Sequence, residues 1–343
     1  MVPNQSLFKA QNLPTKEVKK IQGGIMTCFT DQKSAKNSIW SDIVVLVVLP
    51  IAFLILRTQY IIHMTDAPPT DFGSGSMFDK IASRYDITNR FLALNLDTSW
   101  RRLMVREVLK DVLSEKEADD EKDSKIQILD LATGTADVAL LMAKEFLSMN
   151  SDNTKVNANI IGVDPSANMI HIGKQKVERF LESKSESNID MALQLGDARN
   201  LKEFKESTFH GATMSFGIRN VPEKEDALCE IHRVMKKNPS SKFAILEFSE
   251  PGDDSGILGY MARFFIRHVV PVIGATLSGA PREYMHLQNS IKEFPTPSEF
   301  KKLIENLDCR SAGRRKIGKF RVDALHQLNF GSVQLYVATP YFK

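Results

Sequence analysis

The residues of this chain best suited to chemistry are polar groups that end or follow short apolar runs. Asp130 lies within ILDLA, Asp164 ends NIIGVD, and Asp197 follows ALQLG. Short apolar runs bounded by turn residues are typical of buried strands. Because ligands of open α/β sheets bind at the carboxyl ends of the parallel strands, we expect these carboxylates to face one ligand.

The turn after the first run, TGTAD, contains a single glycine, Gly134. A dinucleotide-binding turn carries several glycines so that a pyrophosphate can reach the helix N-terminus, and their absence disfavours such a cofactor. S-adenosylmethionine (SAM) has no pyrophosphate. Asp130 could receive its amine, directly or through water, and the Thr135 hydroxyl could bind its carboxylate. A strand–glycine–helix turn is also frequent as a purely structural feature.

The next two strand ends suit the nucleoside part of SAM. A carboxylate at Asp164 can accept both ribose hydroxyls. Asp197 can accept from the adenine amino group, while Ala198 offers a backbone N–H. Either aspartate could instead cap a helix, which stabilises a helix by about 1 kcal/mol. Their occurrence in successive strand–helix units favours the ligand interpretation.

Arg219 and Asn220 follow a later strand, within SFGIRN. Methyl transfer to carbon requires an aligned acceptor and a shielded site. A ring hydroxyl that loses its proton supplies the electron density, so the site needs a donor for the phenolate and a proton acceptor. Arg219 and Asn220 would face the same sheet edge as the aspartates. A structural ion pair is the competing interpretation of Arg219.

Hydrophobic patterning predicts a parallel sheet whose strands alternate with helices after residue 125. Two or three helices over 77–113 precede it, a charged loop follows at 114–125, and 314–320 could pair with the last strand. An apolar, aromatic insertion at 256–290 could cover a site for a greasy substrate, although an ordinary packing helix pair fits its periodicity equally. The predicted strands are 125–132, 159–164, 192–197, 211–216, 242–248 and 333–338, and the predicted helices are 138–147, 166–181, 224–235 and 300–307.

The N-terminal 76 residues differ from the rest. The run IVVLVVLPIAFLIL at 43–56 is uncharged but shorter than the about 20 residues of a spanning helix. It could be a membrane anchor, part of an organelle-targeting segment, or a buried helix, and the lack of a polar face favours the first two. The linker DAPPTDFGSGS at 66–76 predicts a boundary between an N-terminal targeting or anchor segment, 1–76, and a domain, 77–343.

Composition excludes some function classes. A net charge of +3 without a basic stripe disfavours a nucleic-acid partner. The three cysteines, Cys28, Cys229 and Cys309, form neither a CxxC pair nor a Cys/His cluster. We therefore expect no metal site and no disulfide framework, which fits a reducing compartment.

Several blocks of sequence resemble a known family. They are FDKIASRYDITN followed by Trp100 and Arg101, SFGIRNV with ALCEIHRVMKK, LEFSEP, and SIKEFP. In this order, over residues 77–343, they resemble the ubiquinone/menaquinone biosynthesis C-methyltransferases, the 2-methoxy-6-polyprenyl-1,4-benzoquinol methylases. The resemblance implies a class I SAM-dependent methyltransferase fold: an α/β, Rossmann-like sheet with an antiparallel last strand.

The resemblance also implies roles for individual residues. Arg219 and Asn220 would lie near the quinol and Tyr85 would line the site. The family's first turn usually reads Gly-Gly-Thr-Gly-Asp, so the methyl groups of Thr133 and Ala136 are departures that could crowd the methionyl group. His286 stands where the family has a second tyrosine. The implied SAM contacts are Thr135, Asp164, Asp197, Ala198 and Ser215.

The function expected from this resemblance is SAM-dependent C-methylation of a 2-methoxy-6-polyprenyl-1,4-benzoquinol in ubiquinone biosynthesis. Alternatives are methylation of demethylmenaquinol or another lipid phenol, and a non-catalytic scaffold of a quinone-biosynthesis complex, which only Thr133 and Ala136 support. The expected partners are the polyprenyl quinol, a membrane surface and a multi-subunit ubiquinone-biosynthesis complex. The expected location is the matrix side of the mitochondrial inner membrane.

Overall fold

The computed structural model describes residues 75–93, 95–118, 125–150, 156–184, 188–251, 256–270, 273, 281–309 and 317–343. All of them belong to one unit, Ile61–Lys343. The apolar run at 43–56 lies outside these residues, so its anchor or targeting role stays a prediction, as does the boundary at residue 76. Among the residues described, no helix combines the length and the apolar character that a membrane crossing requires.

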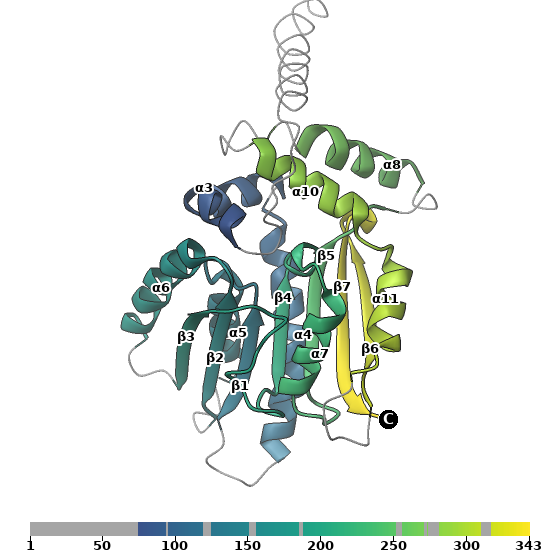
Figure 1. The fold of residues 1–343 in the computed structure, drawn as a ribbon. Coiled ribbons are helices and arrows are strands. Elements are labelled where there is room, and N and C mark those ends of the chain that lie inside the picture. The colour runs from purple at the N-terminus through teal and green to yellow at the C-terminus, as the bar shows by residue number, and fades with distance from the viewer. Residues whose placement is uncertain are drawn as a thin grey trace, which may run out of the picture. The chain divides into compact units, whose positions relative to one another are not determined.

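A seven-stranded sheet forms the centre of the described fold (Figure 1). The strand order is β3-β2-β1-β4-β5-β7-β6, with β1 to β5 parallel and β7 antiparallel to both of its neighbours. The strand order reverses between β1 and β4, the switch point at which such sheets bind ligands. The strands are β1 (Ile126–Leu131), β2 (Ala158–Asp164), β3 (Ile189–Leu195), β4 (Gly211–Ser215), β5 (Lys242–Phe248), β6 (Gly318–Leu328) and β7 (Val333–Phe342).

Helices cover both faces of this sheet, which explains why its strands are apolar without strict alternation. In β1, Ile126 and Ile128 pack into one core cluster, whereas Leu129 and Leu131 pack into the cluster on the opposite face. The first cluster contains α4 (Asp97–Ala118), α5 (Asp137–Met149) and α6 (Ala167–Glu182), and the second contains α7 (Lys224–Val234) and α11 (Pro297–Asn306).

Further helices lie over the carboxyl ends of the strands (Figure 1). They are α3 (Ser76–Leu92), α8 (Gly256–Phe264), which continues as a π-helical turn η4 (Phe265–Val269), and α10 (Pro281–Glu293). Two short 3₁₀ turns, η2 (Ile218–Asn220) and η5 (Asn329–Gly331), lie at the same end. The described helices of the insertion predicted at 256–290 therefore cover the sheet edge where the site was expected.

Most predicted elements agree with the structure to within three residues at each end, and three differ more. β7 continues to Phe342, four residues beyond its predicted end, and α4 continues to Ala118, into the charged run predicted to be a loop. The hairpin partner of β7 is β6, which runs to Leu328 and not only to residue 320. Its sequence FRVDALHQL alternates because it is an edge strand with one exposed face.

The prediction of unpaired cysteines is wrong for two of the three. Cys229 of α7 and Cys309, which follows α11, form a disulfide across 80 residues, with their Cα atoms 5.1 Å apart. Both helices pack their apolar faces into the same core cluster, which brings the two sulfurs together. Sequence spacing does not report such a contact. Cys28 lies outside the described residues. With this disulfide, the cysteines do not indicate a reducing compartment.

Candidate active site

The turn between β1 and α5 presents its backbone to a cavity at the switch point. Ala132, Gly134 and Ala136 have positive φ angles of 51°, 54° and 69°. Glycine adopts this conformation freely, and a Cβ added at Gly134 would meet no atom within 4 Å. The space in front of Gly134 is thus open to a ligand.

This cavity, referred to as the cofactor cavity, brings together most of the predicted strand-end residues. It lies at the ends of β1 to β4. Gly75, which precedes α3, and Phe78 and Asp86 of α3 also line it. The predicted residues along its wall are Gly134, Thr135, Asp164, Asp197, Ala198, Ser215 and Asn220. Their convergence follows from the parallel register of the strands.

Asp130 lies beneath the cofactor cavity and does not line it. Its buried carboxylate accepts hydrogen bonds from the hydroxyls of Thr133 (2.6 Å) and Thr213 (2.7 Å). Burial raises the pKa of Asp130 to about 6, although the two hydroxyl donors oppose this effect. In this geometry Asp130 positions the turn through Thr133. Its predicted contact with the methionyl amine stays a prediction.

Asp164 is a buried carboxylate on the cavity wall. It accepts the backbone N–H of Gly134 (2.8 Å) and of Ser166 (2.9 Å). Burial raises its pKa to about 6 despite these donors. An ionised carboxylate has about four acceptor positions. Asp164 therefore retains the capacity for hydroxyl donors such as those of a ribose.

Asp197 is more exposed and is paired with a cation that the sequence patterns did not single out. Arg199 donates to both of its oxygens, with its terminal nitrogen 2.6 Å from Oδ2. Burial raises the pKa of Asp197, but the hydrogen bonds and charge of Arg199 outweigh it and lower the pKa. Asp197 thus stays ionised, as an acceptor for an amino group must. Ala198 lies beside it on the wall.

Thr135 belongs to a charged network that connects α3 to the sheet. Its hydroxyl donates to Asp86 of α3 (2.8 Å) and accepts from the Lys176 ammonium (2.9 Å). Lys176 also bonds Asp86 at 2.6 Å and Asp137 at 2.9 Å. A carboxylate ligand near Thr135 would meet Lys176, which sequence reasoning missed because it lies in mid-helix, 41 residues further along the chain.

Ser215 ends β4 in the cofactor cavity. Its buried hydroxyl oxygen has no hydrogen-bond partner among the residues that the structure describes. Buried hydroxyls are almost always paired. An unpaired one on a cavity wall is suited to a bound ligand.

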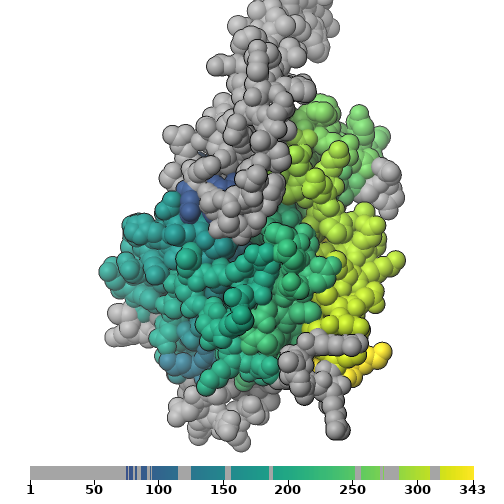
Figure 2. All heavy atoms as spheres, viewed as in Figure 1, coloured from purple at the N-terminus to yellow at the C-terminus, as the bar shows by residue number. Residues whose placement is uncertain are grey.

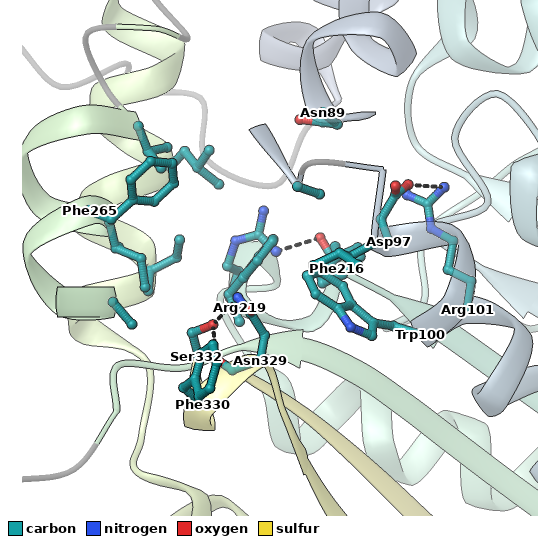
Figure 3. Close-up of a pocket in the computed structure, with 18 of the residues that line it drawn as sticks. Asn89, Asp97, Trp100, Arg101, Phe216, Arg219, Phe265, Asn329, Phe330 and Ser332 are labelled. Atoms are coloured by element: carbon teal, nitrogen blue, oxygen red, sulfur yellow. Dashed lines mark hydrogen bonds and ion pairs between the residues drawn. The ribbon is translucent and has the colours of Figure 1, made fainter. Parts of the chain in front are cut away.

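A second cavity, referred to as the acceptor cavity, adjoins the first and has a volume of about 460 Å³ (Figure 3). Four residues line both cavities: Phe78, Arg101, Phe216 and Asn220. The remaining wall is mainly apolar and comes largely from the helices over the sheet edge. It includes Leu258, Met261, Ala262, Phe265, Ile266 and Leu287. This volume is typical of small-molecule sites.

An aromatic stack lies where the two cavities meet. The rings of Phe216 and Phe248 stack with centroids 4.5 Å apart. The Arg101 guanidinium lies 5.7 Å from the Phe216 ring and that of Arg219 lies 5.7 Å from the Phe248 ring. Phe216 holds a φ of 57°, which is uncommon for a bulky residue. A planar aromatic ligand can pack against such a surface.

Arg219 lines the acceptor cavity and is also held in a buried ion pair. Its guanidinium donates to Glu247 (2.5 Å) and to the Phe216 carbonyl (2.8 Å), and its backbone N–H also bonds Glu247. The side chains of Arg219 and Glu247 are 4% and 0% exposed. Arg219 therefore has both features that the sequence suggested: it forms a structural ion pair, and it lines the cavity in which an acceptor could bind.

The other predicted residues near the acceptor differ in how well they are placed. Asn220 lines both cavities from η2. Tyr85 is on α3, but its side chain is not described. His286 of α10 lines the acceptor cavity, and burial, followed by the charge of Arg219, lowers its pKa to about 4. Among the described residues no cluster of metal-binding side chains is present.

Thr133 and Ala136, which stand where the family usually has glycines, differ in their position relative to the cofactor cavity. The Ala136 methyl is fully buried in the core cluster and is not part of the cavity wall, whereas Thr133 is on the wall. The open space at Gly134, the Asp164 carboxylate and the unpaired Ser215 hydroxyl fit SAM. When bound, SAM supplies an electrophilic methyl group.

The sheet order with antiparallel β7, and a switch-point cavity built from a single-glycine turn and strand-end carboxylates, define a class I SAM-dependent methyltransferase. Residues 70–327 match the ubiE/COQ5 methyltransferase family, and the chain belongs to this family. The resemblance stated from the sequence blocks is confirmed. The chain is a SAM-dependent C-methyltransferase of quinone biosynthesis.

Two curated relatives agree with this assignment. The chain is 36% identical over 225 residues to a ubiquinone/menaquinone biosynthesis C-methyltransferase of Geotalea daltonii, covering 66% of this chain and 83% of the relative. It is 32% identical over 259 residues to a demethylmenaquinone methyltransferase of Thermus thermophilus, covering 73% and 98%. Among solved structures, the plantazolicin methyltransferase BpumL in complex with SAH is similar at a TM-score of 0.44, with 14% identity and coverage of 86% and 99%.

Proposed function

We propose that this enzyme methylates a ring carbon of a 2-methoxy-6-polyprenyl-1,4-benzoquinol in ubiquinone biosynthesis. The observation that carries the proposal is the acceptor cavity: apolar, about 460 Å³, and continuous in its lining with the cofactor cavity through Phe78, Arg101, Phe216 and Asn220. A quinol ring would lie against the aromatic stack. Its prenyl tail would extend toward α8.

The residues of the site contribute position, donors and exclusion of water. The Asn220 amide can donate to a ring oxygen from its place between the cavities, and the Arg219 cation stabilises charge that grows on that oxygen. The apolar residues of α8 and α10 keep water from the reacting methyl group. In the overall reaction the ring carbon gains the methyl group, the sulfonium becomes a thioether, and one ring proton is released.

A demethylmenaquinol is the second candidate acceptor, because the Thermus thermophilus relative carries that name. The benzoquinol has a single ring and the demethylmenaquinol a fused pair of rings. Both carry a hydroxyl beside the methylated carbon, so one cavity could accept either. The discriminating experiment compares kcat/KM of the purified full chain for the two reduced acceptors with equal tail length. We expect the benzoquinol to be preferred at least tenfold, about 1.4 kcal/mol in transition-state binding. Preference for the demethylmenaquinol would overturn the ubiquinone assignment.

We also propose that the enzyme works at a membrane surface, where a polyprenyl substrate resides, on the matrix side of the mitochondrial inner membrane and within a ubiquinone-biosynthesis assembly. The support is the apolar run at 43–56 and the exposed apolar residues of α8. Ile257, Tyr260 and Phe264 are 80%, 64% and 54% exposed, and Leu258 and Met261, which line the acceptor cavity, are 52% and 59% exposed. A helix apolar on both sides is suited to contact with lipid.

Cell fractionation tests this location. We expect the full chain to resist carbonate extraction if the 43–56 segment is retained, and a chain that begins at Met77 to be peripheral or soluble. Full-length protein found wholly in a cytosolic soluble fraction would remove both the anchor and the organelle proposals.

A further inference from the structure

We propose that Asp97, which the sequence patterns did not single out, is the group that takes the proton from the acceptor's ring hydroxyl. This inference rests on the proposed function, because it requires a hydroxylated ring in the acceptor cavity. Asp97 begins α4 and lines that cavity. Figure 3 shows it beside Phe216, on the side of the cavity away from Phe265.

The environment of Asp97 is unusual for a buried carboxylate. The residue is 3% exposed, and neither carboxylate oxygen accepts a hydrogen bond from the described residues. Its one recorded ionic partner is Arg101, whose guanidinium lies 3.4 Å away and is closer to Asp137, at 3.1 Å. Buried carboxylates are normally satisfied by several donors. Two unfilled acceptor oxygens on the wall of a cavity are therefore matched to a donor on the ligand.

A structural role alone does not account for this arrangement. An aspartate in the first turn of a helix is often there to bind backbone N–H groups, but no N–H of the described residues donates to Asp97. An ion pair with Arg101 one turn later would be favourable, but at 3.4 Å without a hydrogen bond it leaves both oxygens without a hydrogen-bond donor from the described part of the chain. By contrast, Glu145 of α5 is also buried and is bonded by Arg102 (2.9 Å) and Arg106 (2.7 Å).

The other groups on the wall are poorer proton acceptors. Arg101 and Arg219 are cations that have no lone pair to offer. His286 is the remaining titratable acceptor, and its burial beside Arg219 disfavours the protonated imidazolium. Asp97 has a carboxylate on the wall, and Arg101, its ionic partner, also lines the cofactor cavity. A carboxylate there can hold a ring hydroxyl next to the aromatic stack.

The proton balance closes with this assignment. As the ring carbon forms its bond to the methyl group, the hydroxyl proton moves from the ring oxygen to Asp97, leaving a ring ketone. The methylated carbon then loses its own proton to water, and the ring oxygen regains the proton from Asp97. The net release is one proton, which balances the positive charge lost by the sulfonium.

The test is Asp97→Asn in the full chain, with Glu145→Gln as the matched control of a buried, ion-paired carboxylate outside both cavities. Rates are divided by the number of SAM-binding sites counted by calorimetry, so that partial unfolding does not imitate a loss of catalysis. We expect kcat for Asp97→Asn to fall at least about 100-fold, as for loss of a general base, with SAM affinity within about threefold of wild type. Glu145→Gln should keep kcat within about threefold.

A second experiment tests whether Asp97 accepts a proton or only holds Arg101 in position. In Asp97→Ala, added formate should restore part of kcat, and a ring acceptor whose hydroxyl is more acidic should lose less rate than the ordinary quinol. An unchanged kcat in Asp97→Asn, or a loss that neither formate nor the more acidic acceptor reduces, would overturn the role. An inactive wild-type enzyme with the benzoquinol would instead contradict the proposed function.

Discussion

At the residue scale, the cofactor cavity depends on carboxylates whose charge the protein controls in opposite directions. Burial raises the pKa of Asp164 to about 6, while Arg199 lowers that of Asp197. Both would accept hydrogen bonds from SAM, and of these two only Asp164 would change its protonation state near pH 6. Asp130, whose pKa is also about 6, does not line the cavity. The charge of Asp164 should therefore set the pH at which SAM binds.

The first prediction follows from that difference. Ribose hydroxyls bind the ionised carboxylate. Bound SAM should therefore lower the pKa of Asp164 below the value of about 6 that it has in the protein without ligand. Binding then releases a proton below pH 6, and SAM affinity should fall as the pH drops from about 7 to about 5. Calorimetric titration across this range measures it. The Asp164→Asn variant is the control and should lose most of the pH dependence; a wild-type affinity independent of pH would contradict the prediction.

The Asp164→Asn variant also supports a second prediction, at constant pH. Each charge-assisted hydrogen bond is worth about 1.5–3 kcal/mol, so loss of the charge should weaken SAM binding at least about tenfold at pH 8. Activity should decline mainly through this weaker binding. An affinity within about twofold of wild type would mean that the strand end of β2 does not bind the cofactor.

A third prediction concerns Arg219, whose effect on the stability of the fold can be measured separately from its effect on turnover. Arg219→Ala should leave SAM affinity largely intact, lower turnover, and destabilise the fold by about 3–5 kcal/mol, because Glu247 keeps a buried charge without a partner. Urea unfolding measures the stability. Adding Glu247→Gln should recover most of it without recovering turnover. If the double variant regains turnover as well, Arg219 serves only the fold.

At the element scale, the strand ends could be predicted because parallel strands bring distant residues to one edge by a simple rule. Asp164, Asp197 and Ala198 reached the cavity in this way. Contacts made by helices that lie over this edge of the sheet follow no such rule. An example is the hydrogen bond between Asp86 of α3 and the Thr135 hydroxyl. Asp97 was missed for the same reason, since nothing in its local sequence shows that α4 begins beside the acceptor cavity.

The disulfide is another element-scale feature that the sequence could not report, and it carries a fourth prediction. Replacing Cys229 and Cys309 by serine should lower the free energy of unfolding by about 2–4 kcal/mol, because the bridge constrains a long loop of the unfolded chain. Reductant should lower the stability of the wild type but not of the variant. Alkylation and mass spectrometry that find both thiols free in protein purified without reductant would refute the pairing.

At the scale of the whole molecule, the proposed function would bring the acceptor from a bilayer into a cavity that α8 helps to line. In Figure 2 the coloured surface at the upper right is formed by α8 and α10. Leu258 and Met261 of α8 line the cavity and are also more than half exposed, so this helix lies between the cavity and the surroundings of the protein. Entry of the tail beside α8 would keep it out of water throughout.

A fifth prediction tests this route. The double variant Ile257→Ser, Phe264→Ser removes two exposed apolar side chains, each worth about 1.5–3 kcal/mol when buried. It should lower kcat/KM at least tenfold for a long-tailed quinol in phosphatidylcholine vesicles and leave a short-tailed soluble quinol almost unaffected. Met149→Ser, an exposed apolar residue on α5, is the control. Equal losses for both acceptors would indicate damage to the cavity instead of a lipid contact.

The most direct test of the account is the position of the transferred methyl group. Purified enzyme is given SAM labelled with ¹³C at its methyl carbon, together with reduced 2-methoxy-6-prenyl-1,4-benzoquinol, and the product is examined by NMR and mass spectrometry. The account predicts one labelled methyl group on a ring carbon, because the two cavities meet at the aromatic stack with the ring oxygen held by donors. A label on a ring oxygen, or no transfer by an enzyme that binds SAM, would contradict it.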